Sequence, residues 1–176
     1  MRTKKIVTFA LLCAVSLVLG FLENTLLVFS IVPGGKVGLA NIITMLVFCA
    51  FSPLEALVFG LFRAFLSSIL FSGIASFWYS AAGAIVSVFF MWCAKKIWNE
   101  KISHIGTSIL GAVGFNIGQL FVSACVIESV QIFRYFPVLG VLSAFSGFIT
   151  GYIAKKTETY IRKEFKITNG ANKKWK

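Results

Sequence analysis

Long apolar runs, separated by short polar or Gly/Pro breaks, make up most of the chain. Six such runs cover Ile6 to Val32, Val37 to Phe51, Leu54 to Phe71, Ala75 to Ala94, Ile105 to Ile127 and Phe133 to Ala154. A helix needs about 20 residues to cross the hydrocarbon core of a bilayer, and only the second run is clearly shorter. None of the runs has the strict period of two that barrel strands need. The pattern therefore predicts an all-α membrane protein, a bundle of six transmembrane helices.

Basic residues gather at the ends of these runs rather than within them. The formal net charge is +11. Fourteen of the seventeen lysines and arginines form three clusters, at the N-terminus, after the fourth run and after the sixth: Arg2, Lys4, Lys5; Lys95, Lys96, Lys101; Lys155, Lys156, Arg162, Lys163, Lys166, Lys173, Lys174, Lys176. The opposite side of a six-span protein has only Lys36 and Arg134. By the positive-inside rule, this asymmetry predicts a multi-pass protein of the plasma membrane, the bacterial inner membrane, with both termini cytoplasmic.

The composition supports one membrane domain and a short tail. The 176 residues are 58% hydrophobic with a mean hydropathy of +0.88, whereas a soluble domain is about 45–50% apolar. We expect a six-helix transmembrane domain over 1–154 and a basic cytoplasmic tail over 155–176. The tail either contacts anionic membrane lipid, at about 1 kcal/mol per Lys or Arg near the surface, or is simply solvated. Nucleic acid is not an expected partner, since its binding needs a basic face on a folded surface.

Residue types that carry catalysis or hold metals are scarce. The four cysteines fall within or at the ends of apolar runs without CxxC spacing, so we interpret them as small buried apolar residues: Cys13, Cys49, Cys93 and Cys125. The single histidine, His104, lies in the central loop, away from any nucleophile along the sequence. The chain contains no aspartate and no GxxxxGK[ST] motif. We expect no metal site, no cofactor, no catalytic residue and no enzymatic activity.

Arg63 is the most informative polar residue because it lies in the middle of the third run. Its guanidinium stays charged at any relevant pH, and placing it among lipid tails costs at least about 2.5–3.5 kcal/mol. The fold must therefore give it an anion, a set of carbonyls or a water-filled cavity. The functional interpretation is a contact with a ligand. The alternative is a structural ion pair, with Glu23 as the first candidate partner.

Other polar residues are expected to lie near the same end of the bundle. The turn Pro33-Gly34-Gly35 allows a tight backbone, and it is expected to direct Lys36 and Asn41 inward. Asn116 and Gln119 are three residues apart and share a face of the fifth helix. Together with Arg63 these residues predict a substrate-binding site: Lys36, Asn41, Arg63, Asn116 and Gln119. The alternative is ordinary hydrogen bonding between helices. Glu55, at the start of the third helix, is expected to be structural.

Small residues recur at a spacing of four and predict close approach of helices. They form one pair near the N-terminus, one pair in the fifth run and a triplet in the sixth: Ala10 and Ala14; Gly114 and Gly118; Ser143, Gly147 and Gly151. Packing within the bundle explains most of them.

Taken together, these features resemble the substrate-binding (S) components of energy-coupling factor (ECF) transporters, which are small six-helix membrane proteins. The sequence Ala10-Leu11-Leu12-Cys13-Ala14 matches an Ala-x-x-x-Ala motif that docks the transmembrane coupling subunit of that family. The stretch from Pro33 to Ile42, PGGKVGLANI, resembles the signature of a family named both "Gx transporter" and "heptaprenyl diphosphate synthase component I".

The resemblance implies a substrate-binding subunit of an uptake transporter for a small molecule. Its partners would be the membrane coupling subunit, docked at Ala10 and Ala14, and two ATPase subunits. The second hypothesis is a non-transporting membrane accessory of prenyl diphosphate or quinone metabolism. The third is a purely structural membrane subunit.

Overall fold

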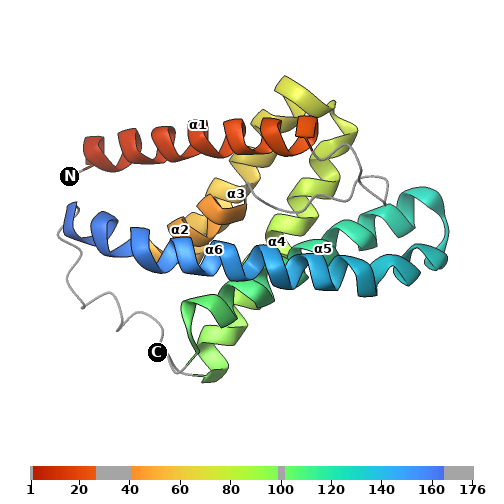
Figure 1. Cartoon of the computed structure of the whole chain (residues 1–176). Coiled ribbons are helices and arrows are strands. Elements are labelled where there is room, and N and C mark those ends of the chain that lie inside the picture. Colours follow the sequence, from red (N-terminus) through yellow and green to blue (C-terminus); the bar gives the residue numbers. More distant parts are fainter. Residues whose placement is uncertain (1, 27–40, 99–101, 165–176) are drawn as a thin grey trace.

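The structure, a computed structural model, describes residues 2–26, 41–98 and 102–164 and contains only helices in those ranges. The elements in chain order are α1 (Arg2–Leu26), α2 (Asn41–Ala50), α3 (Pro53–Ser67), the π-helical turn η1 (Ser68–Ser72), α4 (Ala75–Trp98), α5 (His104–Ile127), the 3-10 turn η2 (Val130–Tyr135) and α6 (Phe136–Glu164). Figure 1 shows the elements gathered into one bundle. The predicted all-α membrane bundle is confirmed.

The described helices are of two kinds, and α2 differs from the rest. Five segments are long and apolar enough to cross a membrane: Lys5–Leu22, Pro53–Ser72, Ala75–Trp98, His104–Ile127 and Val130–Thr157. Helix α2 has 10 residues, which at 1.5 Å per residue is about 15 Å, or half of the hydrocarbon core. All ten of its residues are buried. The core of the bundle therefore lies around a short, fully enclosed helix.

One end of the bundle, which we call the basic end, collects the helix termini that carry the lysine clusters. Lys5 Nζ, near the start of α1, lies 2.6 Å from Glu55 Oε1, near the start of α3. At the end of α2, Cys49 Sγ lies 3.5 Å from Nδ1 of His104, the first residue of α5. Lys95, near the end of α4, lies 5.2 Å from the ring centroid of Phe48. These contacts place the starts of α1, α3 and α5 beside the ends of α2 and α4.

Local sequence signals explain how α3 begins and ends. The Ser52 hydroxyl accepts a hydrogen bond from the Glu55 backbone N–H at 3.3 Å, and Pro53 occupies the first turn, where no N–H is needed. The Glu55 carboxylate then lies at the positive end of the helix dipole. Helix α3 continues into the π-helical turn η1, which ends at Gly73 with a φ of +76°, a conformation that glycine adopts without strain. The position of Glu55 in the first turn of α3 agrees with the structural role that the sequence predicts for it.

Glycines fix the close packing of α4, α5 and α6. A Cβ on Gly118 would lie 2.6 Å from the Ala82 carbonyl oxygen of α4. A Cβ on Gly151 of α6 would lie 2.5 Å from the Ile105 Cα of α5. Such distances are shorter than any ordinary contact, so the backbones approach only because the side chains are absent. The spacing of four in the fifth and sixth runs therefore marks helix packing, as expected.

The cysteines only partly follow the sequence interpretation. Cys13 and Cys49 are buried, whereas Cys93 is half-buried and Cys125 is exposed. The prediction of burial was wrong for Cys125, which lies in the last turn of α5 beside the exposed Val126 and Ile127. In a membrane helix, an apolar residue is equally compatible with a packed face and a lipid-facing one.

The glycine packing makes a direct prediction about stability. We expect Gly151→Ala to destabilise the bundle by about 1–3 kcal/mol, because the new methyl group meets backbone atoms that cannot move aside. The matched control is Gly140→Ala in the same helix, where a Cβ meets nothing within 4 Å and helix propensity favours alanine by about 0.5–1 kcal/mol. Thermal unfolding in detergent measures both variants. Equal midpoints for the two would contradict the close-packing model.

Candidate functional site

The predicted substrate-binding residues that the structure describes are all buried. Asn41 and Arg63 are 7% exposed, and Asn116 and Gln119 are 3% exposed. Lys36 lies outside the described residues. Four polar side chains that are more than nine-tenths buried in a membrane-spanning bundle need partners from the protein, from water or from a ligand.

Asn41 and Thr44 form the polar start of α2. Asn41 Nδ2 donates to the Ser87 hydroxyl of α4 at 3.4 Å, while its Oδ1 has no hydrogen-bond partner among the described residues. Thr44, one turn later, is fully buried, and its hydroxyl also lacks a partner within the described ranges. Its methyl group lies 3.7 Å from the Cβ position of Gly60 on α3. The start of α2 therefore contacts both α3 and α4 and retains hydrogen-bonding capacity there.

Arg63 lies one turn beyond Gly60 on α3, further from the basic end. A Cβ on Gly60 would lie 3.2 Å from the Ala84 Cβ of α4. The ring centroids of Phe65 and Phe77, on the same two antiparallel helices, are 6.2 Å apart. Along α3, Arg63 therefore lies between the Gly60–Ala84 contact and the Phe65–Phe77 contact. The side chain of Glu23, its partner in the alternative hypothesis, lies outside the described part.

Asn116 is bonded to α6 through its amide nitrogen. Its Nδ2 donates to the Leu139 carbonyl at 3.4 Å and contacts the Ser143 hydroxyl. Ser143 itself donates to the Leu139 carbonyl at 2.6 Å. Because a carbonyl only accepts, Nδ2 is the donor and the orientation of the amide is fixed. Asn116 Oδ1 has no partner in the described chain, so this residue both joins two helices and presents a free acceptor.

Gln119 has no comparable hydrogen bonds to other described residues. Both Nε2 and Oε1 are buried and lack a hydrogen-bond partner among the described residues. Its neighbour Gly118 packs on Ala82 of α4, while Asn116 faces α6. With 3.6 residues per turn, Gln119 falls on the arc of α5 between those two packed faces, which is directed toward the interior of the bundle.

The glycine contacts order some of these groups along the bundle. Gly111 of α5 packs on Ser87, the partner of Asn41, whereas Gly118 packs on Ala82. Asn116 and Gln119 therefore lie beyond the start of α2, on the side away from the basic end. Thr44, Ser87 and Ser143 join the polar set without having been included in the predicted site. For Thr44 and Ser87 the only sequence signal was a hydroxyl within an apolar helix, whereas Ser143 was already marked by the spacing of small residues in the sixth run.

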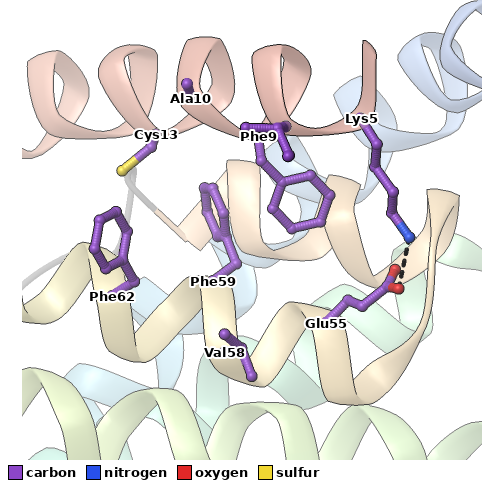
Figure 2. A pocket seen from close by; sticks show the side chains of 9 residues that line it. Lys5, Phe9, Ala10, Cys13, Glu55, Val58, Phe59 and Phe62 are labelled. Carbon is purple, nitrogen blue, oxygen red and sulfur yellow. Dashed lines mark hydrogen bonds and ion pairs between the residues drawn. The ribbon is translucent and has the colours of Figure 1, made fainter. Parts of the chain in front are cut away.

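A separate apolar groove of about 590 Å³ lies between α1 and α3 (Figure 2). Phe9, Cys13, Phe59 and Phe62 line it, and the Lys5–Glu55 ion pair is at one end. None of the predicted substrate-binding residues that the structure describes lines this groove. Ala10, one of the two predicted docking residues, lies on its rim and is exposed, as is Ala14.

With this geometry described, the family can be stated. The family model "Heptaprenyl diphosphate synthase component I" matches residues 12–157. The chain belongs to this family. The match covers the last half of α1, the start of α2 and all of the other buried polar residues. No curated protein and no solved structure matches the chain.

In this family member, His104 is closer to a nucleophile than the sequence indicated. The sequence places it away from any cysteine, but its Nδ1 lies 3.5 Å from Cys49 Sγ. The end of α2 and the start of α5 meet at the basic end, which brings residues 55 positions apart into contact. Cys49 is buried, and we interpret the pair as an interhelical contact of the packed bundle.

The two amides of α5 predict opposite effects on stability. We expect Asn116→Leu to lower the free energy of unfolding by about 1 kcal/mol, because it removes the donor that joins α5 to α6. Gln119→Leu is expected to leave stability unchanged or to raise it, because it removes two buried groups without partners. Thermal unfolding of the two variants, in detergent and without added ligand, provides the measurement. A clear loss of stability in Gln119→Leu would mean that this amide is bonded within the protein.

Proposed function

We propose that this chain is the substrate-binding membrane subunit, or S component, of an ECF-type uptake transporter for a small molecule. The observation that carries the proposal is the set of buried polar side chains on α2 and α5 that have hydrogen-bonding atoms without a partner among the described residues. Buried polar groups in transmembrane proteins are costly and mark binding sites or ion paths. A purely structural bundle gains nothing from buried polar atoms that, like these, have no partner in the described part of the chain.

The proposed site consists of Lys36, Asn41, Arg63, Asn116 and Gln119. In transporters, interrupted or shortened helices often provide polar groups near the middle of the membrane, and α2 is such a short helix. Arg63 supplies a permanent positive charge, which favours an anionic or strongly polar part of the ligand. The chain binds its ligand without converting it, which agrees with the absence of aspartate.

Ala10 and Ala14 are the proposed docking surface for the coupling subunit. Both side chains are exposed on α1, and small residues at a spacing of four let a second helix approach closely. The basic end faces the cytoplasm of the plasma membrane in this proposal, because it carries the lysine clusters. ATPase subunits bound to the coupling subunit then supply the energy for uptake.

A second candidate is a non-transporting accessory of prenyl diphosphate or quinone metabolism. Two observations favour it: the name of the family, heptaprenyl diphosphate synthase component I, and the apolar groove between α1 and α3, with a lysine at one end. Copurification separates the two candidates. Membrane-bound ATPase subunits in the purified complex support transport, whereas a soluble prenyl synthase supports the accessory role.

Docking gives one testable outcome. We expect Ala14→Trp to abolish copurification with the coupling and ATPase subunits, because an indole would hold the two helices apart. Val15→Trp is the matched control, since Val15 is also exposed on α1 (49%) but lies on a different face. Thermal unfolding of the isolated variants shows that both remain folded. Equal recovery of the partners with either variant would exclude this docking surface.

Substitution of Arg63 gives a second test of the proposed function. We expect Arg63→Gln to lose most of the retained small molecule in native mass spectrometry while the protein still inserts into the membrane. Arg63→Lys should lose less, because it keeps the charge but not the planar fork of donors. If Arg63 is instead part of a structural ion pair with Glu23, Arg63→Gln lowers thermal stability, and adding Glu23→Gln restores both stability and ligand retention.

A further inference from the structure

Gln119 is the least satisfied polar side chain that the structure describes in the membrane-spanning helices. Its amide donor and its amide acceptor are both buried, and neither has a hydrogen-bond partner among the described residues. Each buried group left without a partner costs about 1–3 kcal/mol. Such groups in a folded protein are normally explained by water or by a ligand.

The neighbouring acceptors are positioned in advance. Asn116, one turn away on the same face of α5, is oriented by Leu139 and Ser143, so its Oδ1 is a fixed acceptor. Its orientation therefore does not have to be set when a ligand binds, which lowers the cost of binding. Gln119 adds a donor and an acceptor side by side. The two residues together present one donor and two acceptors from a rigid helix.

We propose that Gln119 binds its ligand through a pair of hydrogen bonds to an amide-type edge, an N–H donor beside a carbonyl or ring-nitrogen acceptor. Asn116 Oδ1 accepts a hydrogen bond from a second N–H or O–H of the same molecule. A primary amide is complementary to such an edge, as when Gln or Asn reads the N6 and N7 edge of adenine. The ligand class is a small planar molecule that carries a lactam, imide or carboxamide group.

This inference rests on the proposed function only for the claim that the bound molecule is transported. Binding at Gln119 is a property of the chain alone. The experiments below therefore use the isolated protein, and their outcome is separate from whether a coupling subunit and ATPases copurify with it.

The first experiment tests whether Gln119 faces a polar space. The four native cysteines are replaced by alanine, and Gln119→Cys and Leu120→Cys are made in that background. Leu120 is the matched control, because it is 1% exposed and packs in an apolar cluster with Ile132 and Leu139. Intact cells are treated with an anionic, membrane-impermeant methanethiosulfonate. Variants that insert and keep the midpoint of the cysteine-free protein are compared.

We expect labelling at position 119 to be faster by on the order of tenfold or more, because a thiol in a polar space ionises and a thiol in an apolar one does not. Equal rates at positions 119 and 120, or no labelling at either, would overturn the inference.

The second experiment tests the chemical class. Thermal unfolding of the wild-type protein is measured with millimolar uracil or nicotinamide, and with the matched compounds 1,3-dimethyluracil and N,N-diethylnicotinamide, which lack N–H donors. We expect at least one parent compound to raise the midpoint by about 2–4 °C and its alkylated counterpart to have no effect. Gln119→Leu should remove the response. Equal shifts within each pair, or no shift with any compound, would overturn recognition of an amide edge, and fast labelling at position 119 would then indicate a space that holds only water.

Discussion

In the hydrocarbon core of a membrane no water is available to satisfy polar groups, and the arrangement of this bundle follows from that constraint. Backbone groups are satisfied within the helices, and polar side chains must find partners inside the protein. The amide nitrogen of Asn116 does so through Leu139 and Ser143. Among the described residues, buried polar atoms without a hydrogen-bond partner remain on Asn41, Thr44, Asn116 and Gln119, and these atoms are the basis of the candidate site.

The glycine packing of α4, α5 and α6 makes one side of the site rigid. Gly118 and Gly151 bring helix backbones together so closely that even a methyl group would not fit. A helix held in this way carries Asn116 and Gln119 at fixed positions, and preorganised groups bind with a smaller entropic cost. Packing and binding therefore depend on adjacent faces of the same helix.

Helix α1 differs from the closely packed helices α4, α5 and α6. It packs on α3 and α2 through a few residues, such as Phe9 against Phe51 and Phe59, and much of its surface remains exposed. The groove beside it is apolar and ends at the Lys5–Glu55 pair. The groove available to a partner or a lipid is thus lined by other residues than the buried polar site on α2 and α5. Substitutions in the groove and in the site can therefore be tested independently.

The sequence by itself determined where the helices lie, which end of the bundle carries the lysines, which glycines pack between helices and that Arg63, Asn116 and Gln119 are buried. These properties depend on hydropathy, on charge and on a period of 3.6 residues, all of which are local. Only the tertiary structure decided that Asn116 is bonded to α6 whereas Gln119 has no partner in the described chain, that His104 meets Cys49, and that Cys125 is exposed. Helical spacing fixes which residues share a face, but the neighbours of that face come from segments distant in the sequence, and a local pattern carries no information about them.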